Sequence, residues 1–190
     1  MDTARRNSLV LAARDGDQRA FEKLFIETQS RIYNFIAHLM GDERHAEDLT
    51  QATFIRAWET LAQLRSPEAF IVWLHRIARN TVRDHVRSVG SGRPVEVSRD
   101  RAGESVIDPE DTRRNGSPER ALLLDERDQA LRSAILELPE HHREVVALHH
   151  LDSMPVQDVA EILGVPVGTV LSRLARARGA LHEKLRWLVE

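Results

Sequence analysis

The chain has 190 residues, a formal net charge of −3 and no cysteine, so disulfides and thiolate metal sites are excluded. Hydrophobic residues make up 42% of the sequence, which suffices for one ordinary domain or two small ones. No apolar run approaches the roughly 20 residues of a membrane span, and the charged N-terminus does not resemble a secretory signal. We therefore expect a cytoplasmic protein without membrane insertion.

The N-terminal block, residues 1–88, is predicted to begin with two helices. A short one over residues 7–14 ends at a turn, where Asp17 can cap a long amphipathic helix. Its apolar positions recur every three or four residues until Gly41, where we expect it to stop.

Two further helices of this block follow, and they carry opposite charge. Asp42 can cap the first, and residues 42–59 hold five acidic and two basic side chains. Pro67 suits the first turn of the second, and residues 71–93 hold five arginines and one acidic residue, Asp84. An acidic and a basic helix predict contacts with two different partners.

The segment over residues 89–117 separates this block from the rest of the chain. It is rich in Gly, Pro and charge, has no aromatic residue and shows no sustained apolar period. That composition predicts a flexible linker.

The C-terminal block, residues 118–190, is predicted to contain four helices. Pro118 starts the first and Pro139 restarts the chain into a helix over residues 141–151. A short helix over residues 156–163, a left-handed Gly164 and a long helix over residues 167–188 then form a helix-turn-helix.

The long last helix has two distinct faces. One is an apolar stripe formed by Val167, Val170, Leu171, Leu174, Ala177, Leu181, Leu185 and Leu188. The other presents short polar and basic side chains, namely Thr169, Ser172, Arg173 and Arg176. A helix anchored along one side with such a second face fits a DNA major groove.

Five segments together resemble the bacterial RNA polymerase sigma factors of the extracytoplasmic-function (ECF) type. They are AFEKLF (20–25), AEDLTQATFIRAW (46–58), FIVWLHRIARN (70–80), LPEHHREVVALHHLD (138–152) and VAEILGVPVGTVLSRLARAR (159–178). The resemblance covers most of both blocks in the family's order and implies an all-α fold of two small helical domains joined by a flexible linker.

The resemblance implies that the acidic helix docks on the β′ coiled coil of core RNA polymerase. The residues expected there are Glu47, Asp48, Gln51 and Phe54. Phe54 and Trp58 can anchor either that interface or the core. The motif reads QATF where the family usually has an acidic residue after Gln51, which puts one polymerase contact in doubt.

The resemblance also implies two contacts with promoter DNA. The single-stranded −10 element would be read by the basic helix through Arg76, Asn80, Arg83 and Arg87, because Arg binds phosphates and Asn can bind a base edge. The −35 duplex would be read by Thr169, Ser172, Arg173 and Arg176. Leu171 stands where the family commonly has Lys or Arg, so the preferred bases cannot be copied from relatives.

The leading hypothesis is therefore a sigma factor that directs polymerase to promoters, without cofactor or covalent chemistry of its own. The family further implies an anti-sigma factor as a partner. An alternative is a dimeric helix-turn-helix regulator that binds operator DNA without polymerase. A third hypothesis is a metal-dependent hydrolase. Only the nine histidines suggest it, and no acidic pair lies near them at ligand spacing.

Overall fold

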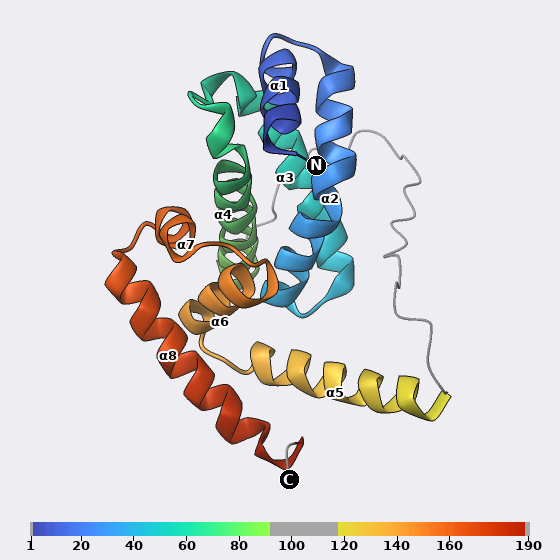
Figure 1. The fold of residues 1–190 in the computed structure, drawn as a ribbon, viewed down its shortest axis with the longest axis vertical. Helices are drawn as coiled ribbons and strands as arrows, with labels where there is room; N and C mark the ends of the chain where they lie inside the picture. Colours follow the sequence, from blue (N-terminus) through green and yellow to red (C-terminus); the bar gives the residue numbers. More distant parts are fainter. Residues whose placement is uncertain (1, 92–117, 189–190) are drawn as a thin grey trace.

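The computed structural model describes residues 2–91 and 118–188, and within those ranges the chain forms helices and no strand (Figure 1). Eight α-helices are described: α1 (Thr3–Arg14), α2 (Gln18–Met40), α3 (Glu43–Thr60), α4 (Phe70–Ser91), α5 (Pro118–Leu136), α6 (Glu140–Val146), α7 (Val156–Leu163) and α8 (Val167–Lys184). Three short turns of helix lie between them, η1 (Leu61–Gln63), η2 (Pro67–Ala69) and the π-turn η3 (Ala147–Leu151), and η4 (Arg186–Leu188) follows α8. The all-α prediction is confirmed.

Local signals in the sequence set the ends of the N-terminal helices. The Asp17 carboxylate accepts hydrogen bonds from the amides of Arg19 and Ala20 at 2.9 and 3.2 Å, so it caps α2. Gly41 ends that helix with φ 72°, a conformation that favours glycine. Asp42 then caps α3 through the Arg44 amide at 3.0 Å.

Two predicted helix boundaries need correction. Helix α1 begins at Thr3 rather than at residue 7, and α4 continues to Ser91, so residues 89–91 are helical and do not belong to a linker. No proline follows Pro67 until Pro94, so nothing in the covalent chain stops α4 earlier. The remaining linker prediction, residues 92–117, lies outside the described residues.

The helix predicted over residues 141–151 also differs from the observed one. It is α-helical only to Val146 and continues as the π-turn η3, in which the Asp152 amide donates to the Ala147 carbonyl five residues earlier. Such single π-turns are often found at functional positions. Here the turn directly precedes Asp152.

The helix-turn-helix is formed by α7, Gly164 and α8. Gly164 has φ 67°, as predicted for the residue that ends the first helix. On α8 the buried line runs through Val170, Leu174 and Ala177. Val167 and Leu171, predicted in the same stripe, are 39% and 52% exposed. At about 100° per residue they lie to one side of the buried line, beyond the reach of the supporting helices.

The two blocks pack against each other. One continuous cluster of buried apolar side chains contains Ile32, Phe35 and Leu74 from the N-terminal block and Leu148 and Val159 from the C-terminal block. Figure 1 shows α6 and α7 beside α2 and α4, and contacts join α4 to α7 and α2 to both α5 and α6. Within the described ranges, no helix combines the length and apolar character needed to span a bilayer.

Candidate nucleic-acid and protein interfaces

Helix α3 presents an acidic surface. Glu47, Asp48 and Gln51 are exposed, while the opposite side of the helix is buried against α2 and α4. Burial, followed by the nearby carboxylates of Glu43 and Glu47, raises the pKa of Tyr33 on α2. Tyr33 therefore borders the acidic surface, and its place there was not predicted from the sequence because it depends on how α2 packs on α3.

Phe54, the fourth residue predicted for this surface, lies in the core. Its side chain is 4% exposed and its ring meets that of Phe25 edge-on, with centroids 4.8 Å apart. Of the two positions that the sequence left open for Phe54, the structure shows the core, where the ring packs α3 against α2. Trp58 packs similarly, with its ring centroid 4.9 Å from that of Phe21.

Helix α4 presents the predicted basic face. Arg76, Asn80 and Arg87 are exposed, and Arg83 is partly exposed. The Arg83 guanidinium lies 3.7 Å from the Glu140 carboxylate on α6. Trp73 is partly buried against the core, as its place in the apolar stripe predicts. Three of the four predicted residues thus face solvent, and the fourth faces the other block.

On α8, the four predicted residues share one side. Ser172 and Arg176 are exposed, and Thr169 and Arg173 are partly exposed. The pKa of the neighbouring His142 on α6 is lowered, first by burial and then by the nearby positive charges of His141, Arg176 and Arg173. Arg173 and Arg176 therefore form a positive surface next to α6.

The nine histidines are spread over several helices. Among residues 2–91 and 118–188, no group of three or more His, Asp or Glu side chains is arranged to hold a metal ion. The rings of His141 and His142 contact each other in a tilted arrangement with centroids 4.3 Å apart, and those of His45 and His85 do so at 5.0 Å. These pairs lie on surfaces of α6, α3 and α4.

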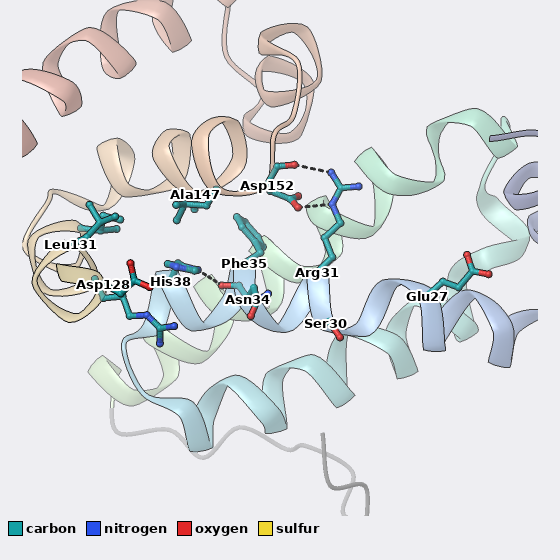
Figure 2. Close-up of a pocket in the computed structure, with 13 residues that line it drawn as sticks. Glu27, Ser30, Arg31, Asn34, Phe35, His38, Asp128, Leu131, Ala147 and Asp152 are labelled. Atoms are coloured by element: carbon teal, nitrogen blue, oxygen red, sulfur yellow. Dashed lines mark hydrogen bonds and ion pairs between the residues drawn. The ribbon is translucent and has the colours of Figure 1, made fainter. Parts of the chain in front are cut away.

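A further polar site joins the blocks, and sequence reasoning missed it. A cavity of about 600 Å³ lies between α2, α5 and η3, and at its wall Arg31 meets Asp152 (Figure 2). The Arg31 Nε donates to Asp152 Oδ1 at 2.5 Å and its Nη2 to the Asp152 carbonyl at 3.1 Å. The partners are 121 residues apart, so no local pattern could have revealed the pair.

Comparison with known proteins identifies the class to which this fold and these surfaces belong. Residues 24–91 match the family model for sigma-70 region 2, and residues 128–181 match that for sigma-70 region 4. The two matched segments fall in the two helical blocks. The chain is thus built from two modules of the sigma-70 class of transcription initiation factors.

The relatives narrow this class. The chain is 34% identical over 181 residues to the RNA polymerase sigma-H factor of Pseudomonas aeruginosa, covering 95% of this chain and 94% of that one. It is 33% identical over 189 residues to the ECF RNA polymerase sigma-E factor of Escherichia coli K12, with the same coverage. The protein belongs to the ECF family of RNA polymerase sigma factors, and it directs polymerase to promoters for transcription initiation.

Two solved structures share the fold. CnrH, solved in complex with the cytosolic domain of CnrY, aligns with a TM-score of 0.69 and 26% identity, covering 96% of this chain and 97% of that one. The sigma factor RpoE of Bartonella quintana, solved with the anti-sigma factor NepR, aligns with a TM-score of 0.67 and 26% identity, covering 87% and 96%. These matches do not favour the alternative of a dimeric operator-binding regulator.

Proposed function

We propose that the two blocks divide the work of promoter recognition. Residues 1–88, extended to 91 by the observed end of α4, would bind core polymerase and the single-stranded −10 element. Residues 118–190 would bind the −35 duplex, with residues 92–117 as the connection. The match of region 2 to the first block and of region 4 to the second supports this division.

Within the first block, the acidic surface of α3 would dock on the β′ coiled coil through Glu47, Asp48 and Gln51. The single observation that carries this proposal is that adjacent helices expose opposite charges, acidic on α3 and basic on α4. A basic protein partner fits the former and nucleic acid the latter. Phe54 would act indirectly, by holding α3 in place.

On α4, Arg76, Arg83 and Arg87 would bind phosphates, and Asn80 would bind a base edge of the melted strand. On α8, Ser172, Arg173 and Arg176 would contact base edges in the major groove, and Thr169 the backbone. An Arg that binds a guanine through both its N7 and O6 contributes about 1–3 kcal/mol of discrimination.

The protein would act in the cytoplasm, together with polymerase, and perform no covalent chemistry. An anti-sigma factor is the further partner we propose. The support is that the structural neighbours CnrH and Bartonella quintana RpoE were each solved with a protein partner, in the latter case an anti-sigma factor.

Transcription in vitro with core RNA polymerase tests the division of work. Asn80→Ala and Arg176→Ala should each lower promoter-specific initiation while binding to core polymerase persists. The double variant Glu47→Lys/Asp48→Lys should do the reverse and lose polymerase binding. Glu22→Lys/Glu161→Lys, which reverses two other exposed carboxylates, is the charge-matched control and should bind normally. Loss of polymerase binding in Asn80→Ala or Arg176→Ala would contradict the assigned roles.

A further inference from the structure

The polar face of α8 carries positive charge that no carboxylate balances. On other helices, Arg31, Arg56 and Arg79 each lie 3.1 Å or less from an Asp or Glu oxygen. Across the described ranges, no Asp or Glu oxygen lies within ion-pair distance of Arg173 or Arg176. These two arginines are about one helical turn apart, so together they form a surface on which an anion is favoured.

Two histidines of α6 border the same surface. Helix α6 packs along α8, and the rings of His141 and His142 contact each other with centroids 4.3 Å apart. His141 is exposed and His142 is partly exposed. The Nε2 atom of His142 is buried, and within the described part of the chain it has no hydrogen-bond partner. No hydrogen bond at Nε2 therefore fixes the protonation state of this ring.

The charged groups that act on His142 are all positive. Burial is the largest cause that lowers the pKa of its imidazole, followed by His141 on the same helix and by Arg176 and Arg173 on α8. Helices α2 and α5 also pack on α6, and among the described residues neither adds a charge to this set. The free chain therefore keeps His142 mostly neutral at pH 7, beside two arginines whose charge a bound anion would offset.

His150 offers a comparison on the other side of α8. Burial, followed by His149 and Arg178, lowers its pKa as well. At 100° per residue, Arg178 lies about 160° around the helix from Arg176. His142 therefore borders the face of α8 proposed to bind DNA, and His150 does not, although both imidazoles lie near arginine.

The phosphate backbone of a nucleic-acid duplex is the anion that fits this surface best. A guanidinium presents two parallel N–H donors to a phosphate, and a protonated imidazole donates from both ring nitrogens. The neighbouring side chains on α8, Thr169 and Ser172, are short and at least partly exposed. They leave room for the edge of a rigid duplex to approach α8 closely.

We propose that His141 and His142 of α6 complete a phosphate-binding surface with Arg173 and Arg176 of α8, and that His142 takes up a proton when the backbone of duplex DNA occupies this surface. The choice of duplex DNA rests on the proposed function; the anion-binding surface does not.

The proton uptake follows from charge. A bound phosphate offsets the two arginines and so removes the electrostatic part of the cause that keeps the proton off His142. The complex then binds more protons than the free chain, so falling pH favours the complex. The gain in affinity is lost as pH rises above the pKa that His142 has in the complex.

Duplex binding by the full chain at a series of pH values tests the proposal. Phosphate contacts carry no sequence information, so a duplex of arbitrary sequence at low salt serves as the probe. The affinity of the unaltered chain should rise about threefold between pH 7.5 and pH 6.0, within the tenfold per pH unit that one coupled proton allows. His142→Asn should lose most of this rise, and His150→Asn, the matched control, should keep it. An equal loss in both variants would overturn the proposal.

Titration of the imidazoles by NMR gives a readout that a merely structural role for His142 would not move. The pKa of His142 should rise when the duplex is added, while that of His150 should stay the same. Arg176→Gln should raise the pKa of His142 in the free chain, because it removes a nearby positive charge. These measurements need no substitution of His142, so they decide the matter even if His142→Asn loses helical circular dichroism. An unchanged pKa of His142 at saturation with duplex would overturn the proposal.

A competitor identifies the occupant. Poly-L-glutamate, which stands for an acidic protein partner, should displace the labelled duplex far less than unlabelled duplex does at equal charge concentration. Displacement as strong as that by unlabelled duplex would overturn the assignment to a nucleic-acid backbone.

Transcription in vitro separates this inference from the proposed function. A chain that binds duplex with the expected pH dependence but never initiates with core RNA polymerase would support the phosphate-binding surface and refute the proposed function. Promoter-specific initiation by a chain whose duplex binding does not depend on pH would refute the proton uptake by His142 alone.

Discussion

Helices α8 and α4 are the two proposed nucleic-acid readers, and they are held in different ways. Helix α8 buries one narrow line, Val170, Leu174 and Ala177, within its own block and leaves its polar face open. Helix α4 buries Leu74 and Ala78 in the core. Its Arg79 also forms an ion pair with Glu144 of the other block. The polar face of α8 is thus exposed to solvent, whereas Arg79 and Arg83 of α4 are paired with carboxylates of the other block.

The difference has a physical origin in what each helix borders. The supporting helices of α8 cover one side of it, so its remaining surface is solvated whatever the blocks do. Helix α4 is at the centre of the molecule, with contacts to α2, α3 and α7. Helix α4 therefore has less free surface than α8, although Arg76, Asn80 and Arg87 still face solvent.

The largest expected effect is a loss of stability when a buried leucine is replaced by alanine in each of the two helices. Leu74→Ala on α4 and Leu174→Ala on α8 each empty a buried site, which typically costs about 2–5 kcal/mol of unfolding free energy. Since both leucines belong to one continuous core, both variants should lower the midpoint of one shared unfolding transition. Calorimetry that resolves two transitions, each moved by one variant, would contradict a shared core.

Leu171→Arg tests whether the exposed surface of α8 contacts the −35 duplex. Leu171 is half exposed, so the change should alter stability by less than about 0.5 kcal/mol. On the DNA face, one added phosphate contact would steepen the salt dependence of −35 duplex binding by about one unit in the log–log slope. Ile26→Arg on α2, at an equally exposed apolar position, is the control and should leave that slope unchanged.

A smaller effect is expected for an exposed ion pair on α4. Asp84 lies 3.1 Å from Arg56 of α3, with both side chains about half exposed. Pairs of this kind contribute about 0–1 kcal/mol, so Asp84→Asn should shift the midpoint of chemical denaturation only slightly. A loss of unfolding free energy well above about 1 kcal/mol would contradict the weak, solvent-exposed character of this pair.

The smallest effect is a pH dependence of stability. Burial lowers the pKa of His38, and burial followed by neighbouring cations lowers the pKa values of His142 and His150. These imidazoles bind protons more readily in the unfolded chain. Their contribution to stability is therefore complete above the ordinary value of 6.5 and is lost as pH falls from there to the folded pKa. The thermal midpoint should be lower at pH 5.5 than at pH 7.5; a rise on acidification would contradict these shifts.

Local chemistry in the sequence was enough to predict most helices and their ends. Asp17 and Asp42 cap the helices they precede, and Gly41 and Gly164 adopt the left-handed conformation that ends a helix. The charged faces of α3 and α4 and the polar face of α8 follow from periodicity alone. All of these features depend on residues within about four positions of each other, where sequence patterns are informative.

Tertiary structure decided what each face meets. Phe54 could have anchored the core or a partner and lies in the core, while Leu171 fits the apolar stripe of α8 but is exposed. Arg79 and Glu144 are 65 residues apart along the chain, and each belongs to a helix whose pattern is satisfied without the other. Periodicity fixes the direction in which a side chain points, and only the packing of distant helices fixes the group that it finds there.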